Sequence, residues 1–166
     1  IPALPPVASN VMRIKPENFR SLFSVRQQMA DLDYQEVVNY SFVEEAWEKD
    51  FAGNEDPIRL LNPIASQMSV MRSTMIGNLV ANVRYNLNRK FSRIRLFEIG
   101  AVFLKNSEVK DGPASVAGYD QPKRLAAIAY GLADEEQWGL PDRQVDFYDV
   151  KADLEALFAP VSLRFV

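Results

Sequence analysis

The residues that could do chemistry gather in the middle of the chain. An apolar, Met-rich segment over residues 62–74 carries Arg72 near its end. A guanidinium holds a phosphate or a carboxylate through two parallel hydrogen bonds, so Arg72 could contact a ligand. Because a charge inside a protein core needs a partner, Arg72 could instead pair with a buried carboxylate. We favour the second interpretation, with Glu98 as the candidate partner.

Glu98 lies in a long apolar run, residues 93–104, which predicts a strand covered on both faces. Alternation along that strand places Glu98 on the face of Leu96 and Leu104, so we expect its carboxylate to point into a packed layer. An unpaired carboxylate would be costly there. No histidine or second carboxylate stands nearby in the sequence to share acid–base work. We therefore predict that Arg72 and Glu98 form a structural ion pair without a catalytic role.

A helix that we expect the Ser73 hydroxyl to cap offers a second candidate site. Its apolar residues fall on one face at helical spacing, and a polar face lies opposite. Basic residues interleaved with aromatic ones, over residues 84–95, can bind RNA. The same residues could stabilise a helix C-terminus or anchor a protein interface, which we favour. The candidate interface or RNA-facing residues are Asn78, Asn82, Arg84, Tyr85 and Arg89, and the basic cluster comprises Arg84, Arg89, Lys90, Arg93 and Arg95.

Acidic residues near the end of the chain could be read as a metal or acid–base group. They are Asp149, Asp153 and Glu155, with Lys151 among them. A more ordinary interpretation is that Asp149 caps a helix over residues 150–158 and that the others face solvent.

The composition excludes several classes of site. Among the 166 residues there is no histidine and no cysteine, so a zinc site or a Ser-His triad cannot be built from this chain. A net charge of -3 argues against general nucleic-acid binding, which needs a positive field. No apolar run approaches the length of a membrane span. We expect a cytoplasmic protein with no membrane partner, no metal and no cofactor bound by these residues.

Helices and strands do not alternate regularly along the chain. The predicted elements favour an α+β fold with an antiparallel sheet flanked by helices. Residues 1–14 are rich in proline and suggest a linker, and residues 15–166 suggest one domain that is incomplete at its C-terminus. We expect the two longest strands to form an antiparallel hairpin. The predicted helices cover residues 16–33, 44–50 and 150–158 and a stretch that follows Ser73 and has Arg89 near its end. The predicted strands cover residues 35–42, 58–61, 93–104 and 124–132.

Five short segments, in order along the chain, resemble the β subunit of bacterial phenylalanyl-tRNA synthetase. The similarity is to its central domain, which is built like the catalytic core of a class II synthetase, and it spans residues 15–158. The segments are Asn62-Pro63-Ile64, Met68-Ser69-Val70-Met71-Arg72, Asn86-Leu87-Asn88-Arg89, Arg95-Leu96-Phe97-Glu98-Ile99-Gly100 and Asp146-Phe147-Tyr148-Asp149-Val150-Lys151.

The resemblance implies a tetramer of two α and two β chains that attaches phenylalanine to its tRNA, tRNA-Phe, with ATP and magnesium. In that family the α subunit holds the working active site, and the β core is a degenerate copy of it. The implied role of this chain is therefore structural support of the α/β assembly. The alternative is a module that contacts tRNA directly through the basic cluster over residues 84–95.

The resemblance also identifies a lost catalytic position. Class II enzymes carry an arginine near the end of a strand that is followed by a loop and a returning strand. The matching position here is Leu104, and the acidic residue expected two positions later is Asn106. A hydrocarbon side chain cannot grip a phosphate, so we expect no catalytic residue in this chain.

Overall fold

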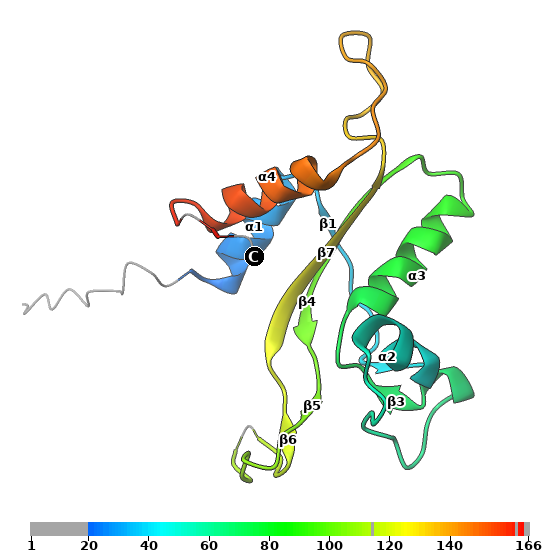
Figure 1. The fold of residues 1–166 in the computed structure, drawn as a ribbon, viewed down its shortest axis with the longest axis vertical. Coiled ribbons are helices and arrows are strands. Elements are labelled where there is room, and N and C mark those ends of the chain that lie inside the picture. Colours follow the sequence, from blue (N-terminus) through cyan, green and yellow to red (C-terminus); the bar gives the residue numbers. More distant parts are fainter. Residues whose placement is uncertain (1–19, 114, 162, 165–166) are drawn as a thin grey trace, which may run out of the picture.

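The computed structural model describes residues 20–113, 115–161 and 163–164. The linker expected over residues 1–14 and the predicted helix start at residue 16 lie outside this part of the chain. Figure 1 shows a long twisted ribbon of two strands with helices on either side of it. The predicted α+β class is confirmed. No helix in the described part of the chain has the length and apolar character needed to cross a membrane.

The central sheet has three strands in the order β1-β4-β7. Strands β4 (Arg93–Ala101) and β7 (Lys123–Gly131) pair antiparallel along their full nine-residue lengths. This confirms the expected hairpin. The short strand β1 (Gln35–Glu36) pairs parallel with β4, so the sheet is mixed and the prediction of an antiparallel sheet was wrong in this respect. A parallel neighbour needs a long crossover, which residues 37–92 supply.

One face of the sheet packs against helix α3 (Ile76–Leu87). The helix buries the apolar stripe that its spacing predicts, and the strand residues on this face alternate with those on the other. This layer lies to the right of the ribbon in Figure 1. The buried residues of this core are Leu79, Val83, Ile94 and Leu96.

The opposite face is covered by helices α1 (Leu22–Asp31) and α4 (Phe147–Phe158). Helix α4 begins one residue after Asp146, whose carboxylate accepts hydrogen bonds from the backbone N–H groups of Tyr148 and Asp149. The prediction that Asp149 caps this helix was therefore wrong. Asp149 lies in the first turn and completes a reciprocal capping pair with Asp146. The buried residues of this second core are Met29, Tyr34, Phe97 and Leu157.

Smaller elements extend the α3 layer. Helix α2 (Glu45–Ala52) packs against α3 at Gly77, where an added Cβ would lie 2.9 Å from a ring carbon of Trp47. The remaining elements are strands β2 (Phe42–Val43), β3 (Val70–Met71), β5 (Leu104–Lys105) and β6 (Tyr119–Asp120) and the 3-10 helix η1 (Ser66–Met68).

Two predicted strands are shorter than expected. The strand predicted over residues 35–42 is interrupted, so that only β1 and the start of β2 form. The strand predicted over residues 58–61 is reduced to a single bridge between Arg59 and Val70. Over residues 35–42 the chain passes from the central sheet to the sheet of β2 and β3, and residues 58–61 run beside β3 with one bridge, which apolar composition alone does not reveal.

Candidate functional site

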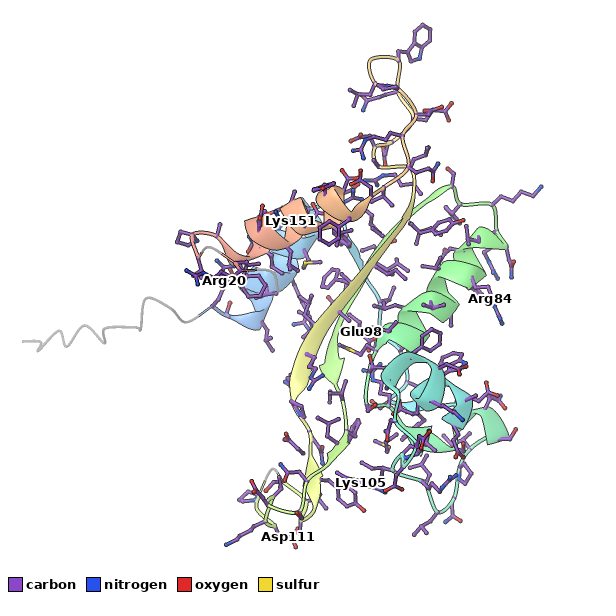
Figure 2. The ribbon with its side chains drawn as sticks, viewed as in Figure 1. Arg20, Arg84, Glu98, Lys105, Asp111 and Lys151 are labelled. Carbon is purple, nitrogen blue, oxygen red and sulfur yellow. The ribbon has the colours of Figure 1, made fainter. Side chains whose placement is uncertain are left out.

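Two deeply buried charges form an ion pair between the sheet and helix α3. Arg72 follows β3 and Glu98 lies in the middle of β4. A guanidinium nitrogen of Arg72 lies 2.7 Å from a carboxylate oxygen of Glu98, and the two side chains are only 2% and 4% exposed. Figure 2 shows Glu98 between the strand ribbon and α3. The two residues that we predicted to pair are thus placed against each other.

Every nitrogen of the Arg72 guanidinium contacts an oxygen atom of the protein. Besides the contact with Glu98, its Nε donates to the carbonyl of Ala101 at 3.1 Å, and Nη1 donates to the Asn78 side-chain oxygen at 3.4 Å. Gly100 makes room for this arrangement, because a Cβ there would lie 2.4 Å from Arg72 Nη2. Because each nitrogen contacts a protein oxygen and the side chain is 2% exposed, the guanidinium is not open to a phosphate or a substrate carboxylate.

Two asparagines complete the network around Glu98. The Asn39 amide donates to the second carboxylate oxygen of Glu98 at 2.8 Å, and the Asn82 amide donates to the side-chain oxygen of Asn39 at 3.1 Å. The network thus joins the segment after β1, helix α3, strand β4 and the end of β3. Buried ions are tolerated when such hydrogen bonds satisfy their remaining polar atoms. Asn39 was not expected in this network, because it lies inside the strand predicted over residues 35–42 and no local pattern indicates its distant partner Glu98.

The polar face predicted on α3 divides into two groups. Asn78 and Asn82 turn inward, where they contact Arg72 and Asn39. Arg84, Tyr85 and Arg89 lie near the end of the helix and are exposed, and Figure 2 shows Arg84 pointing away from the sheet. Asn78 is buried and Asn82 is half-buried, so the exposed part of the predicted face consists of Arg84, Tyr85 and Arg89, and its contact with a partner stays a prediction.

Tyr85 and Arg89 form a preorganised surface pair. The Arg89 guanidinium carbon lies 3.3 Å from the centre of the Tyr85 ring, and an Arg89 nitrogen donates to the Tyr85 carbonyl at 3.1 Å. The Tyr85 side chain is 57% exposed. Stacking keeps both groups in place at the surface, as expected of an interface anchor.

The basic cluster over residues 84–95 is also divided. Arg93 pairs with Asp33 at 2.5 Å, and Arg95 pairs with Asp153 at 2.8 Å. Both lie on the α1/α4 side of the sheet, because alternate residues of a strand face the same side. Arg84, in the last turn of α3, and Arg89 and Lys90, just beyond its end, remain exposed. The cluster therefore does not form one continuous basic surface.

A second polar network lies under α1 and α4. The Tyr34 hydroxyl donates to Asp153 at 2.8 Å, and the Arg95 guanidinium lies over the Tyr34 ring. Burial, with the hydrogen bond to the Asp153 carboxylate, raises the pKa of the Tyr34 phenol well above its usual value. Tyr34 therefore stays neutral and donates a hydrogen bond that holds α4 to the turn between α1 and β1.

Glu48 is a buried carboxylate that sequence reasoning missed. It is 1% exposed and lies on α2. Its oxygens accept hydrogen bonds from the backbone N–H of Ser73 at 2.9 Å and from the Asn54 amide at 2.8 Å. The expectation that Ser73 caps α3 was wrong, because the residue before that helix is Met75. Neighbouring acidic residues made Glu48 look like part of a solvated face.

The acidic residues near the C-terminus do not build a metal site. Within the described part of the chain, no group of three or more acidic side chains is placed to hold a metal ion. Asp149 receives a two-point contact from Arg143, with nitrogen–oxygen distances of 2.6 and 2.7 Å. This contact lowers the pKa of Asp149 to about 2, and the hydrogen bond from the backbone N–H of Asp146 makes the next largest contribution. Asp149 thus serves to fix the start of α4.

The fold and its internally satisfied ion pair define a structural module of the α+β class. A family model described as the phenylalanyl tRNA synthetase beta chain CLM domain matches residues 1–166, and the chain belongs to this family. The resemblance seen in the sequence is thereby confirmed.

Similar proteins include two phenylalanine–tRNA ligase beta subunits. The one from Ralstonia nicotianae is 62% identical over 165 residues, which cover 99% of this chain and 20% of that protein. The one from Bordetella bronchiseptica is 60% identical over 168 residues, which cover 100% of this chain and 21% of that protein. The chain therefore spans about a fifth of the length of these relatives. A solved pyrrolysyl tRNA synthetase from Desulfitobacterium hafniense matches with a TM-score of 0.46 and 16% identity, over 82% of this chain and 42% of that chain.

Replacing Glu98 with Gln keeps the shape of the side chain but removes its charge. We expect the free energy of unfolding to fall by about 3 kcal/mol, because the Arg72 guanidinium is left buried without its counter-ion. For a chain of this size the melting temperature should drop by roughly 6–12 °C.

Glu45→Gln is the matched control, because it removes an exposed pair with Arg59. Exposed pairs contribute little to stability, so its melting temperature should stay near that of the wild type. Equal melting temperatures for Glu98→Gln and the wild type would contradict a structural role of the buried pair.

Proposed function

We propose that this chain is the non-catalytic core of the β subunit of a phenylalanine–tRNA ligase. In the proposed assembly of two α and two β chains, the α subunit joins phenylalanine to tRNA-Phe with ATP and magnesium, and this core supports it. The names of the relatives support the activity of the whole protein. The observation that carries the structural role is the Arg72 guanidinium, which is directed entirely at protein atoms.

We further infer that the core derives from a class II synthetase fold. The long antiparallel pair β4–β7 with its connecting loop fits the strand, loop and returning strand of that pattern. Leu104, at the position matching the arginine of class II enzymes, lines a shallow hollow with Ser73 and Phe103. The neighbouring Lys105 is engaged by Asp56 at 2.6 Å. These residues do not fit a nucleotide phosphate, so no chemical step is assigned to this chain.

Direct contact with tRNA through residues 84–95 is the less favoured function. Two of the five basic residues of that cluster are engaged in ion pairs with Asp33 and Asp153. The net charge of -3 also opposes a polyanion. Contact between tRNA and other parts of the proposed ligase is compatible with this assignment, as is a cytoplasmic location.

The proposed function is tested by mixing the full-length β subunit, which we call the full chain, with the α subunit. We expect the two to co-elute as one complex that charges tRNA-Phe. The full chain without the α subunit should form no phenylalanyl-adenylate, measured by phenylalanine-dependent exchange of diphosphate into ATP. Saturable, magnesium-dependent exchange by the full chain alone would reject the non-catalytic assignment, and separate elution would reject the proposed assembly.

Replacing Tyr85 and Arg89 together with Ala should weaken the assembly about tenfold or more. The stacked pair is exposed and preorganised, and truncation of such an anchor commonly costs more than 1 kcal/mol of binding energy. The dissociation constant is measured by analytical ultracentrifugation. Tyr119→Ala/Lys123→Ala is the matched control, since it removes an exposed aromatic and an exposed cation elsewhere. Identical dissociation constants for both variants and the wild type would place the interface on another surface.

A further inference from the structure

The loop between β7 and α4 projects beyond the end of the sheet. Figure 1 shows this orange segment extending away from both helical layers. We call residues 133–142 the projecting loop. Its Trp138 has a relative exposure of 108%, and Leu140 is 48% exposed. An indole held fully in water is unusual, because tryptophan normally buries most of its large apolar surface.

The projecting loop rises from a fixed base. The Ala133 backbone N–H donates to the Arg143 carbonyl at 2.8 Å, and the Val145 N–H donates to the Gly131 carbonyl at 2.8 Å. The Ala133 carbonyl in turn accepts a hydrogen bond from Arg95 at 3.2 Å. These contacts clamp both arms of the loop to the sheet. Binding through a preorganised loop loses less conformational entropy than binding through a free segment.

The charge of the projecting loop indicates which kind of partner surface it can bind. Ten consecutive residues contain four carboxylates and no basic residue. Among the residues that the structure describes, none of these carboxylates belongs to an ion pair. Such a loop is repelled by RNA phosphates and attracted by a basic protein surface. Two copies of the loop would repel each other as well. The carboxylates are Asp134, Glu135, Glu136 and Asp142.

We propose that the projecting loop docks on the α subunit, with Trp138 inserted into an apolar recess that is bordered by Lys and Arg side chains. This inference rests on the proposed function and names the contact through which the assembly is held. Tryptophan is the residue type most typical of interface hot spots, and the surrounding carboxylates provide the polar rim. The exposed indole and the unpaired carboxylates then find partners in the same contact.

The test compares the full chain carrying Trp138→Ala with the wild type in binding to the α subunit. We expect the dissociation constant to rise about 30-fold, as for a hot-spot residue. The melting temperature of the free chain should not change, since the side chain contacts no core. Leu61→Ala is the matched control, because Leu61 is 98% exposed in a different loop. It should leave the dissociation constant unchanged.

A second variant tests the charge of the recess. Glu135→Lys/Glu136→Lys should slow association at low salt, and the difference from wild type should shrink as salt is raised. Glu55→Lys, at an exposed position outside the loop, is the control. Binding of Trp138→Ala with wild-type affinity would overturn this inference while leaving the proposed function intact. Failure of the wild-type chain to bind the α subunit would overturn both. Loss of self-association in Trp138→Ala, with α-subunit binding unchanged, would also overturn the inference and identify a second copy as the occupant.

Discussion

The arrangement of this fold depends on one buried ion pair. Arg72 and Glu98 lie 2.7 Å apart in a space almost closed to water. Removing two charges from water costs several kcal/mol for each ion, and the cost is offset only if the remaining polar atoms are satisfied. The Ala101 carbonyl and the side chains of Asn78 and Asn39 satisfy them. Helix α3, strand β4 and the end of β3 are therefore held in a single arrangement.

The same buried ion pair limits the functions that the interior of the molecule can have. The Arg72 guanidinium is buried against protein atoms, so it cannot stabilise the charge that develops on a phosphate during a reaction. Catalysis by this residue would require that stabilisation. The proposed function therefore acts through the surface of the chain. Two surface features are preorganised: the stacked Tyr85–Arg89 pair at the C-terminal end of α3 and the clamped loop that carries Trp138. Both fit a module that supports a catalytic partner.

The sequence predicts those parts of the fold that depend on continuous local patterns. The apolar runs of β4 and β7 and the helical spacing of Leu79 and Val83 identify the main layers. Such patterns indicate a strand or a helix whatever the rest of the fold is. The direction of β1 was not predictable, since a two-residue strand carries no signal for it. Asn39 and Glu48 escaped notice because their burial depends on distant partners in β4 and in the segment before α3. Asn78 and Asn82 share a helix face with Tyr85, but they turn inward because Asn78 contacts Arg72 and Asn82 contacts Asn39.

The central claim is that the buried charges serve the fold and not the chemistry. It is tested most directly by replacing both at once, with Arg72→Met and Glu98→Leu, and measuring the rate at which the assembled ligase charges tRNA-Phe. An apolar pair of similar volume often restores the stability that either single replacement loses. The account predicts a folded, assembled variant with the wild-type charging rate. A variant that folds and assembles normally but has lost charging would contradict it.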